Sequence, residues 1–158
     1  MFVFADEPPR PPVLTCEQRS MAGFPRAFSN PENLVVGPLV MVGAARFTTE
    51  QTVRDFGGNK FQLLVENRHR VRIRVVSDDA ALAYGPGPEG RAKLRDGRRV
   101  MRFRACRRRS GSRSGRRKVT FWSGFVLTSR PQCVRLRVRV DGRRRARRTA
   151  IPLGRECG

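Results

Sequence analysis

The chain has 158 residues, of which 34 are Lys or Arg and 13 are Asp or Glu, so its formal net charge is +21. A chain of this length suits one domain with a sizeable hydrophobic core. A membrane-spanning helix needs roughly 18 consecutive apolar residues, and the longest apolar run, residues 34–45, is interrupted by Gly37, Pro38 and Gly43. The sequence therefore predicts a single domain with no transmembrane helix.

The positive charge lies almost entirely in the second half of the chain. Residues 1–90 contain ten basic and ten acidic residues, whereas residues 91–118 contain fourteen basic residues and one acid, Asp96. Residues 135–148 contain eight arginines and one acid, Asp141. Such asymmetry is typical of chains that meet a polyanionic partner or surface. Because nearly all the bases are arginine, a GC-rich coding sequence that fills surfaces with arginine is the competing interpretation.

Residues 1–32 are rich in proline and have little hydrophobic periodicity. They predict an extended N-terminal arm laid over a domain formed by residues 33–158. The first five residues read like the end of a signal peptide, because Ala5 precedes a polar, proline-rich stretch. We therefore expect a secreted or cell-envelope protein whose signal peptide is missing or truncated in this chain.

From Leu34 onward, short apolar segments alternate with turn signals. The predicted strands cover residues 34–42 (a bulged or edge strand), 60–66, 70–76, 81–84, 99–106, 119–128, 133–140 and 147–153. Residues 49–56 could form a helical turn, and residues 107–118, which contain no apolar residue, predict a flexible basic loop. Short strands at this spacing predict an all-β fold: a single immunoglobulin-like antiparallel β-sandwich of about seven to nine strands.

Three of these strands alternate strictly between apolar residues and arginine, and their apolar sides are expected to form the core. The predicted core positions are Val71, Ile73, Val75, Met101, Phe103, Val134, Leu136, Val138 and Val140, joined by Phe121 and Phe125. Trp122 has the opposite parity and is expected on the outer face or under a loop. If two of the strands pair in one sheet, their arginines form a field of like charges that a bound polyanion would relieve. If the strands divide between two sheets, the charges are simply solvated on separate faces.

The four cysteines, Cys16, Cys106, Cys133 and Cys157, lack the spacing of a zinc site, and His69 is the only histidine. Two disulfides in an oxidising compartment are the favoured interpretation, and four buried thiols in a cytosolic protein are the alternative. Local geometry permits Cys133–Cys157 with Cys16–Cys106. We favour Cys106–Cys133 with Cys16–Cys157, which would join the two ends of the chain.

Several segments from residue 99 onward resemble a group of secreted proteins. The segments are Val100–Cys106, Phe121–Phe125, Pro131–Val134 and Leu153–Cys157, together with Val36–Leu39. They resemble secreted β-sandwich proteins of GC-rich Gram-positive bacteria, a group without a known activity. The resemblance implies export, paired cysteines and a sandwich fold, and it assigns no functional residue.

The sequence contains no catalytic signature. His69 lies between Arg68 and Arg70, which favours a solvated turn residue over a catalytic base. The adjacent acids Asp78 and Asp79 favour a turn cap over a cation site or a glycosidase pair. No nucleophile elbow, phosphate-binding loop or metal motif is present, so we expect neither an enzyme nor a cofactor or metal.

The functional hypothesis is therefore binding to an anionic surface or polymer. The ligand would be an anionic envelope polymer, lipid headgroups or an acidic polysaccharide. The predicted anion-binding residues are Arg102, Arg104, Arg107, Arg108, Arg109, Arg116, Arg117, Lys118, Arg135, Arg137 and Arg139. The alternatives are a structural or protein-interaction module of an envelope assembly and, third, a cytosolic nucleic-acid-binding protein, which lacks clustered aromatic residues for stacking.

Overall fold

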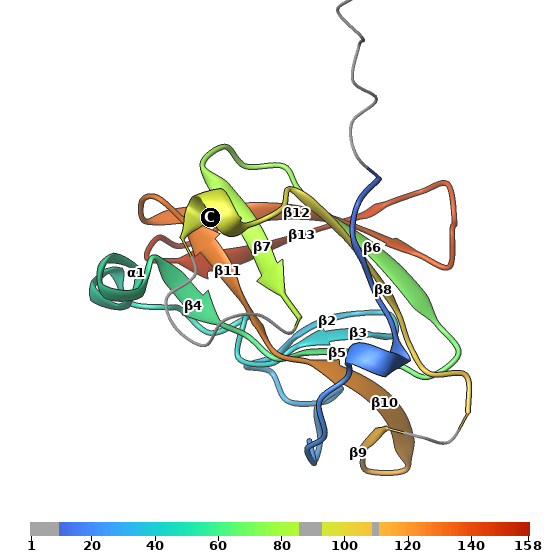
Figure 1. The fold of residues 1–158 in the computed structure, drawn as a ribbon. Coiled ribbons are helices and arrows are strands. Elements are labelled where there is room, and N and C mark those ends of the chain that lie inside the picture. Colours follow the sequence, from blue (N-terminus) through green and yellow to red (C-terminus); the bar gives the residue numbers. More distant parts are fainter. Residues whose placement is uncertain (1–9, 86–92, 109–110) are drawn as a thin grey trace, which may run out of the picture.

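A computed structural model describes residues 10–85, 93–108 and 111–158 (Figure 1). The fold is an all-β sandwich made of three sheets. Sheet 1 contains, in spatial order, β1 (Val13–Leu14), β8 (Val100–Arg104), β6 (Arg70–Val75), β12 (Gln132–Val140) and β13 (Arg147–Leu153). Sheet 2 contains β2 (Leu34–Val36), β3 (Leu39–Met41), β5 (Leu63–Glu66), β10 (Arg117–Trp122) and β9 (Ser112–Ser114). Sheet 3 contains β4 (Gly58–Lys60), β11 (Gly124–Thr128) and β7 (Ala80–Tyr84).

The main core lies between the apolar side of sheet 1 and the inner sides of sheets 2 and 3. The alternating apolar residues of β6, β8 and β12 are all buried, as the sequence predicts. They pack in one cluster with Leu63 and Val65 of sheet 2 and with Leu82 and Val126 of sheet 3. The period of two in the sequence therefore fixes which side of sheet 1 faces the core.

The N-terminal segment forms a second core on the outer side of sheet 2. Phe24 and Ala27 pack there against Val40, Leu64 and Phe121, and the rings of Phe24 and Phe121 lie 4.8 Å apart, edge to face. The backbone N–H of Ser20 donates to the Phe121 carbonyl over 2.8 Å. Sheet 2 is therefore covered on both sides, by the main core on one and by this segment on the other.

This second layer explains why the prediction for Trp122 is wrong. Phe121 faces the second core, so its neighbour Trp122 faces the main core, where it is fully buried. The Trp122 indole N–H donates to the Thr15 carbonyl over 3.0 Å, and its ring lies 5.4 Å from that of Phe103. Phe125, predicted as a core residue, is only half-buried because it lies on the opposite side of β11 from Val126, which faces the main core.

Several predicted strands are divided, so the described residues contain thirteen strands instead of seven to nine. Residues 34–42 form the hairpin β2–β3, with Gly37 at φ 55° in its turn, instead of one bulged strand. The predicted helical turn is α1 (Glu50–Phe56), which Thr49 caps at the N-terminus and Gly57 ends in the left-handed conformation. The remaining helical elements are the short 3₁₀ helices η1 (Cys16–Gln18) and η2 (Leu94–Asp96). The immunoglobulin-like strand arrangement stays a prediction.

The prediction of one flexible loop over residues 107–118 is wrong for residues 112–118, which belong to the β9–β10 hairpin. The reason lies in two serines that the sequence presents as loop residues. Ser112 and Ser114 are buried, and their hydroxyls accept hydrogen bonds from the backbone N–H groups of Ala22 (2.9 Å) and Ala27 (3.1 Å). The N-terminal segment therefore holds the hairpin in the sheet.

The two disulfides are Cys16–Cys106 and Cys133–Cys157, so the favoured pairing of Cys106 with Cys133 and of Cys16 with Cys157 is wrong. β8 and β12 both run antiparallel to β6. They therefore run parallel to each other, which places Cys106 after the end of β8 and Cys133 near the start of β12, at opposite ends of sheet 1. The parallel pairing of β1 with β8 brings Cys16 to Cys106.

Removing each disulfide separately is expected to lower the free energy of unfolding by different amounts. Cys16–Cys106 joins residues 90 apart, and Cys133–Cys157 joins residues 24 apart. The longer loop restricts the unfolded chain more, so the C16A/C106A variant should lose about 4–5 kcal/mol and C133A/C157A about 3–4 kcal/mol. Urea unfolding of both double variants measures the difference. A peptide map without reductant that links Cys106 to Cys133 would contradict the pairing.

Candidate anion-binding face

Three rows of arginine lie side by side on the outer side of sheet 1. β6 is the central strand and pairs with β8 on one side and with β12 on the other. Since the apolar residues of all three strands point to the core, the alternating arginines point outward together. This surface, called the arginine face, consists of Arg70, Arg72, Arg74, Arg102, Arg104, Arg135, Arg137, Arg139 and, from β13, Arg148.

The strand register places arginine directly opposite arginine. Arg72 pairs with Arg102 on β8 and with Arg139 on β12. On either side of this central row, Arg70 lies opposite Arg104, and Arg74 and Arg148 both lie opposite Arg137. Like charges directly opposite each other in antiparallel strands destabilise a sheet. The Cα atoms of directly opposed residues lie about 5 Å apart, which is well inside the Debye length at physiological salt, so the charges of opposed arginines on this surface repel one another.

No acidic side chain neutralises these charges within the part of the chain that the structure describes. The ion pairs of the described residues use other bases, namely Arg54, His69, Arg117 and Arg130. Arg102 donates from Nε and from one terminal nitrogen to the Pro11 carbonyl, over 3.2 and 2.9 Å. The other guanidinium groups of the face have no side-chain hydrogen bond or ion pair to a described residue.

The face contains two adjoining hollows between its rows of side chains. The first, of about 240 Å³, is lined by the side chains of five arginines and by residues at its edge, namely Val13, Arg70, Val71, Arg72, Arg102, Phe103, Arg104, Arg139 and Gly142. The second, of about 160 Å³, is lined by Arg72, Arg74, Arg137, Arg139 and Ala146. Arg72 and Arg139 line both, so the hollows form one continuous basic surface.

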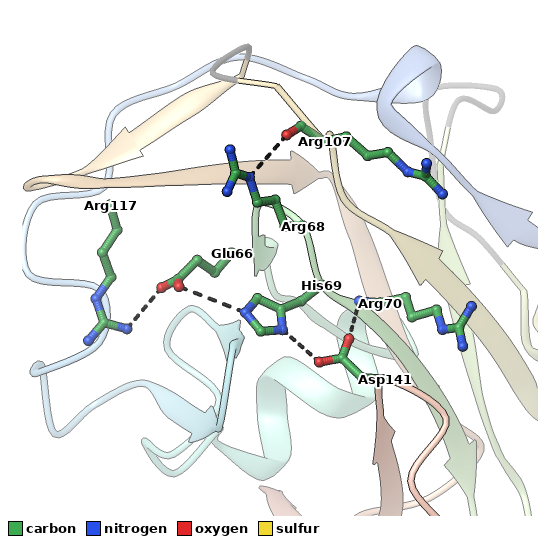
Figure 2. A network of polar contacts seen from close by, with 7 residues as sticks. All are labelled: Glu66, Arg68, His69, Arg70, Arg107, Arg117 and Asp141. Carbon is green, nitrogen blue, oxygen red and sulfur yellow. Dashed lines mark hydrogen bonds and ion pairs between the residues drawn. The ribbon is translucent and has the colours of Figure 1, made fainter.

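A polar network closes one end of the face, where β6 begins and β12 ends (Figure 2). His69 Nδ1–H donates to Asp141 Oδ2 over 2.7 Å, and His69 Nε2 lies 3.9 Å from a Glu66 oxygen. The Arg70 backbone N–H donates to the other Asp141 oxygen over 3.0 Å. Glu66 also forms an ion pair with Arg117, at 3.1 Å. Both carboxylates are therefore engaged by partners of the network, and Asp141 also lines a hollow at this end of the face together with Arg70 and Arg104.

The network fixes the charge state of Asp141. Partial burial alone would raise the pKa of this carboxyl group, but the Arg70 backbone N–H, the His69 side chain and the charge of Arg143 together lower the pKa below its usual value. Among the described residues, the His69 ring contacts only carboxylates and no hydroxyl or thiol that it could activate. The network has the contacts of a structural tie between strand ends, not those of a nucleophilic triad.

The structure brings together some of the predicted anion-binding residues and separates others. Five of them lie on the arginine face, namely Arg102, Arg104, Arg135, Arg137 and Arg139. Arg107 lines a neighbouring hollow with Arg104, and Arg108 follows it, whereas Arg109 lies outside the described residues. Arg116, Arg117 and Lys118 belong to the β9–β10 hairpin in sheet 2 and are not part of the arginine face.

Arg117 has partners of its own. Besides its ion pair with Glu66, its guanidinium lies 4.2 Å from the centre of the Phe28 ring. Conversely, the face includes Arg70, Arg72, Arg74 and Arg148, which were not among the predicted site residues. The alternation of residues 70–76 indicates that the first three point outward. That they lie at the centre of the face follows only from the pairing of β6 with β8 and β12.

Comparisons with protein-family models, with curated proteins and with solved structures gave no match. The resemblance to secreted sandwich proteins therefore stays a prediction. Among the described residues, no helix is long and apolar enough to cross a membrane, and no group of side chains has the composition of a metal site. The same residues contain no free cysteine.

Replacing Arg72 by glutamine should stabilise the protein. The change removes the charge that faces both Arg102 and Arg139, so we expect a gain of about 0.5–1 kcal/mol in the free energy of unfolding at low salt. The gain should shrink in high salt as repulsion is screened. Arg72→Lys, which keeps the charge, is the control. Urea unfolding in which both variants behave alike would show that repulsion is not the cause.

Asp141→Asn should make stability less dependent on acid pH. Because the folded-state pKa of Asp141 is lowered, its contribution is complete above the ordinary pKa of an aspartate and is lost as pH falls through the folded value. The variant should be less stable than the wild type by about 1 kcal/mol at neutral pH, from a weakened hydrogen bond to His69, and equally stable in strong acid. Thermal unfolding from neutral to strongly acidic pH tests this. A constant difference would contradict it.

Proposed function

We propose that this protein is a secreted or cell-envelope binding domain without enzymatic activity, which holds an anionic polymer on its arginine face. The observation that carries the proposal is the pairing of three arginine strands in one sheet with no acidic partner among the described residues. A bound polyanion supplies the missing counter-charge. Arginine suits this role because its planar guanidinium forms paired hydrogen bonds with phosphate, sulfate and carboxylate groups.

The arrangement of charges supports this proposal over arginine as a mere filler of surfaces. A coding bias would spread arginines without regard to strand pairing, whereas here the outward positions of β6, β8 and β12 oppose one another row by row. The destabilising repulsion is kept, and the acids at the end of the face, Glu66 and Asp141, form their ion pairs with His69 and Arg117 and not with the arginine rows. A surface whose charges repel one another when it is empty, and whose repulsion is reduced when an anion binds, is characteristic of a binding site.

The proposal places the protein in an oxidising compartment. Two disulfides are formed, and disulfides persist mainly in secreted and envelope proteins. In such a compartment, the proposed ligand is an anionic envelope polymer or an acidic polysaccharide. The polymer would contact the face and the adjoining Arg107, and not the β9–β10 hairpin, which lies in another sheet and whose Arg117 is already paired.

The test is polyanion affinity as a function of salt, with heparin as the probe. The face variant is R72Q/R74Q/R137Q/R139Q, and the matched control, R46Q/R95Q/R113Q/R116Q, removes four exposed charges outside the face. In nucleic acids, each lost contact reduces the magnitude of the negative slope of log K against log salt by about 0.7–0.9. We therefore expect the slope of the face variant to be smaller in magnitude by about 3, and the slope of the control to be almost unchanged. Equal losses would show that binding follows net charge and not the face.

A further inference from the structure

We propose that the first hollow of the arginine face is a specific site for a compact oligophosphate group, meaning two or three directly linked phosphoryl groups. The inference rests on the proposed function, because it names the part of the anionic ligand that is recognised most tightly. Its basis is the convergence of five arginines from three strands on one hollow of about 240 Å³.

Two of the five arginines at this hollow are less exposed than the other arginines of β6, β8 and β12. Arg102 is half-buried and fixed by two hydrogen bonds to the Pro11 carbonyl. Arg139 is also half-buried. A terminal nitrogen of Arg70 lies 3.2 Å from the place that a Cβ on Gly142 would occupy, so the Arg70 side chain extends to the turn after β12. Positions fixed before binding lose less entropy when an anion arrives.

The number of hydrogen-bond donors around the hollow indicates which kind of anion fits it. Each guanidinium carries five N–H donors, and a carboxylate has sites for about four hydrogen bonds, so two forked arginines already saturate it. A phosphoryl group adds charge and offers three strong acceptor oxygens. Five arginines within one hollow therefore exceed what a single carboxylate or a single phosphate can satisfy. Two or three linked phosphoryl groups supply enough oxygens and enough charge in a small volume.

The rest of the face is different, and this makes the site testable. Arg74 and Arg137 are also a directly opposed pair on the face, but they do not line the first hollow. Arg70 and Arg104 form the equivalent opposed pair inside it. Removing either pair takes the same charge from the same surface, so only a specific site distinguishes the two changes.

The experiment is isothermal titration calorimetry at fixed ionic strength, with inorganic tripolyphosphate and, for comparison, citrate, whose anionic groups are carboxylates. We expect a single site that binds tripolyphosphate about tenfold or more tighter than citrate. R70Q/R104Q should lose about tenfold in tripolyphosphate affinity, and R74Q/R137Q should change it little. R70K/R104K keeps the charge but lacks the paired N–H donors of the guanidinium groups, so it should recover only part of the affinity. Adenosine triphosphate in the same titration distinguishes a free phosphate chain from a nucleotide as the source of the group.

The outcomes separate this inference from the proposed function. If heparin binds through the face but tripolyphosphate binds no tighter than citrate, the oligophosphate site is wrong and the polymer-binding function stands. An equal loss of tripolyphosphate affinity in both double variants would also overturn the site, because binding would then depend on the total charge of the face and not on the first hollow. If heparin does not bind the wild-type protein at all, the proposed function itself fails.

Discussion

The structure depends on the packing of three strands in which every second side chain is apolar. In β6, β8 and β12 those side chains are buried between the sheets, and burial of this kind stabilises by about 25 cal/mol per Å² of apolar surface. Because side chains alternate strictly along a strand, burying one set turns the other set outward. The core therefore creates the arginine face as a direct geometrical consequence, and shifting any one of these strands by a single residue would bury its arginines.

The N-terminal segment and the disulfides extend this constraint to the rest of the chain. β1 adds to sheet 1 beside β8, and Cys16 bonds to Cys106 just past the end of that pairing. From there the segment crosses to the outer side of sheet 2, where Phe24 and Ala27 form the second core. The same chain thus touches the edge of the arginine face through Pro11 and closes the opposite layer. One segment couples the face to the stability of the domain.

Local periodicity predicts much of this fold, because a strand that packs on one side carries its burial pattern in its own residues. The bounds of β6, β12 and β13, the buried residues of β8 and the capped helix α1 all follow from nearby residues. Pairing between distant segments does not follow from periodicity. β6 and β12 are more than fifty residues apart, so the alternation indicates two arginine rows but not that they are neighbours. The prediction for Trp122 was wrong because it depends on which distant segment covers sheet 2, and the disulfide pairing was wrong because it depends on the relative direction of distant strands.

The competition between core and face explains how so much like charge is tolerated. Each repulsive pair on sheet 1 costs a fraction of a kcal/mol, whereas each buried Val, Ile, Leu or Phe beneath it contributes about 1.5–3 kcal/mol. Val71 and Ile73 alternate with Arg72, and Val138 and Val140 lie on either side of Arg139. Every strand that carries repulsion thus also carries the burial that exceeds it. Because the apolar side holds the strands in register, the arginines can be arranged for an external anion and need not be neutralised within the protein.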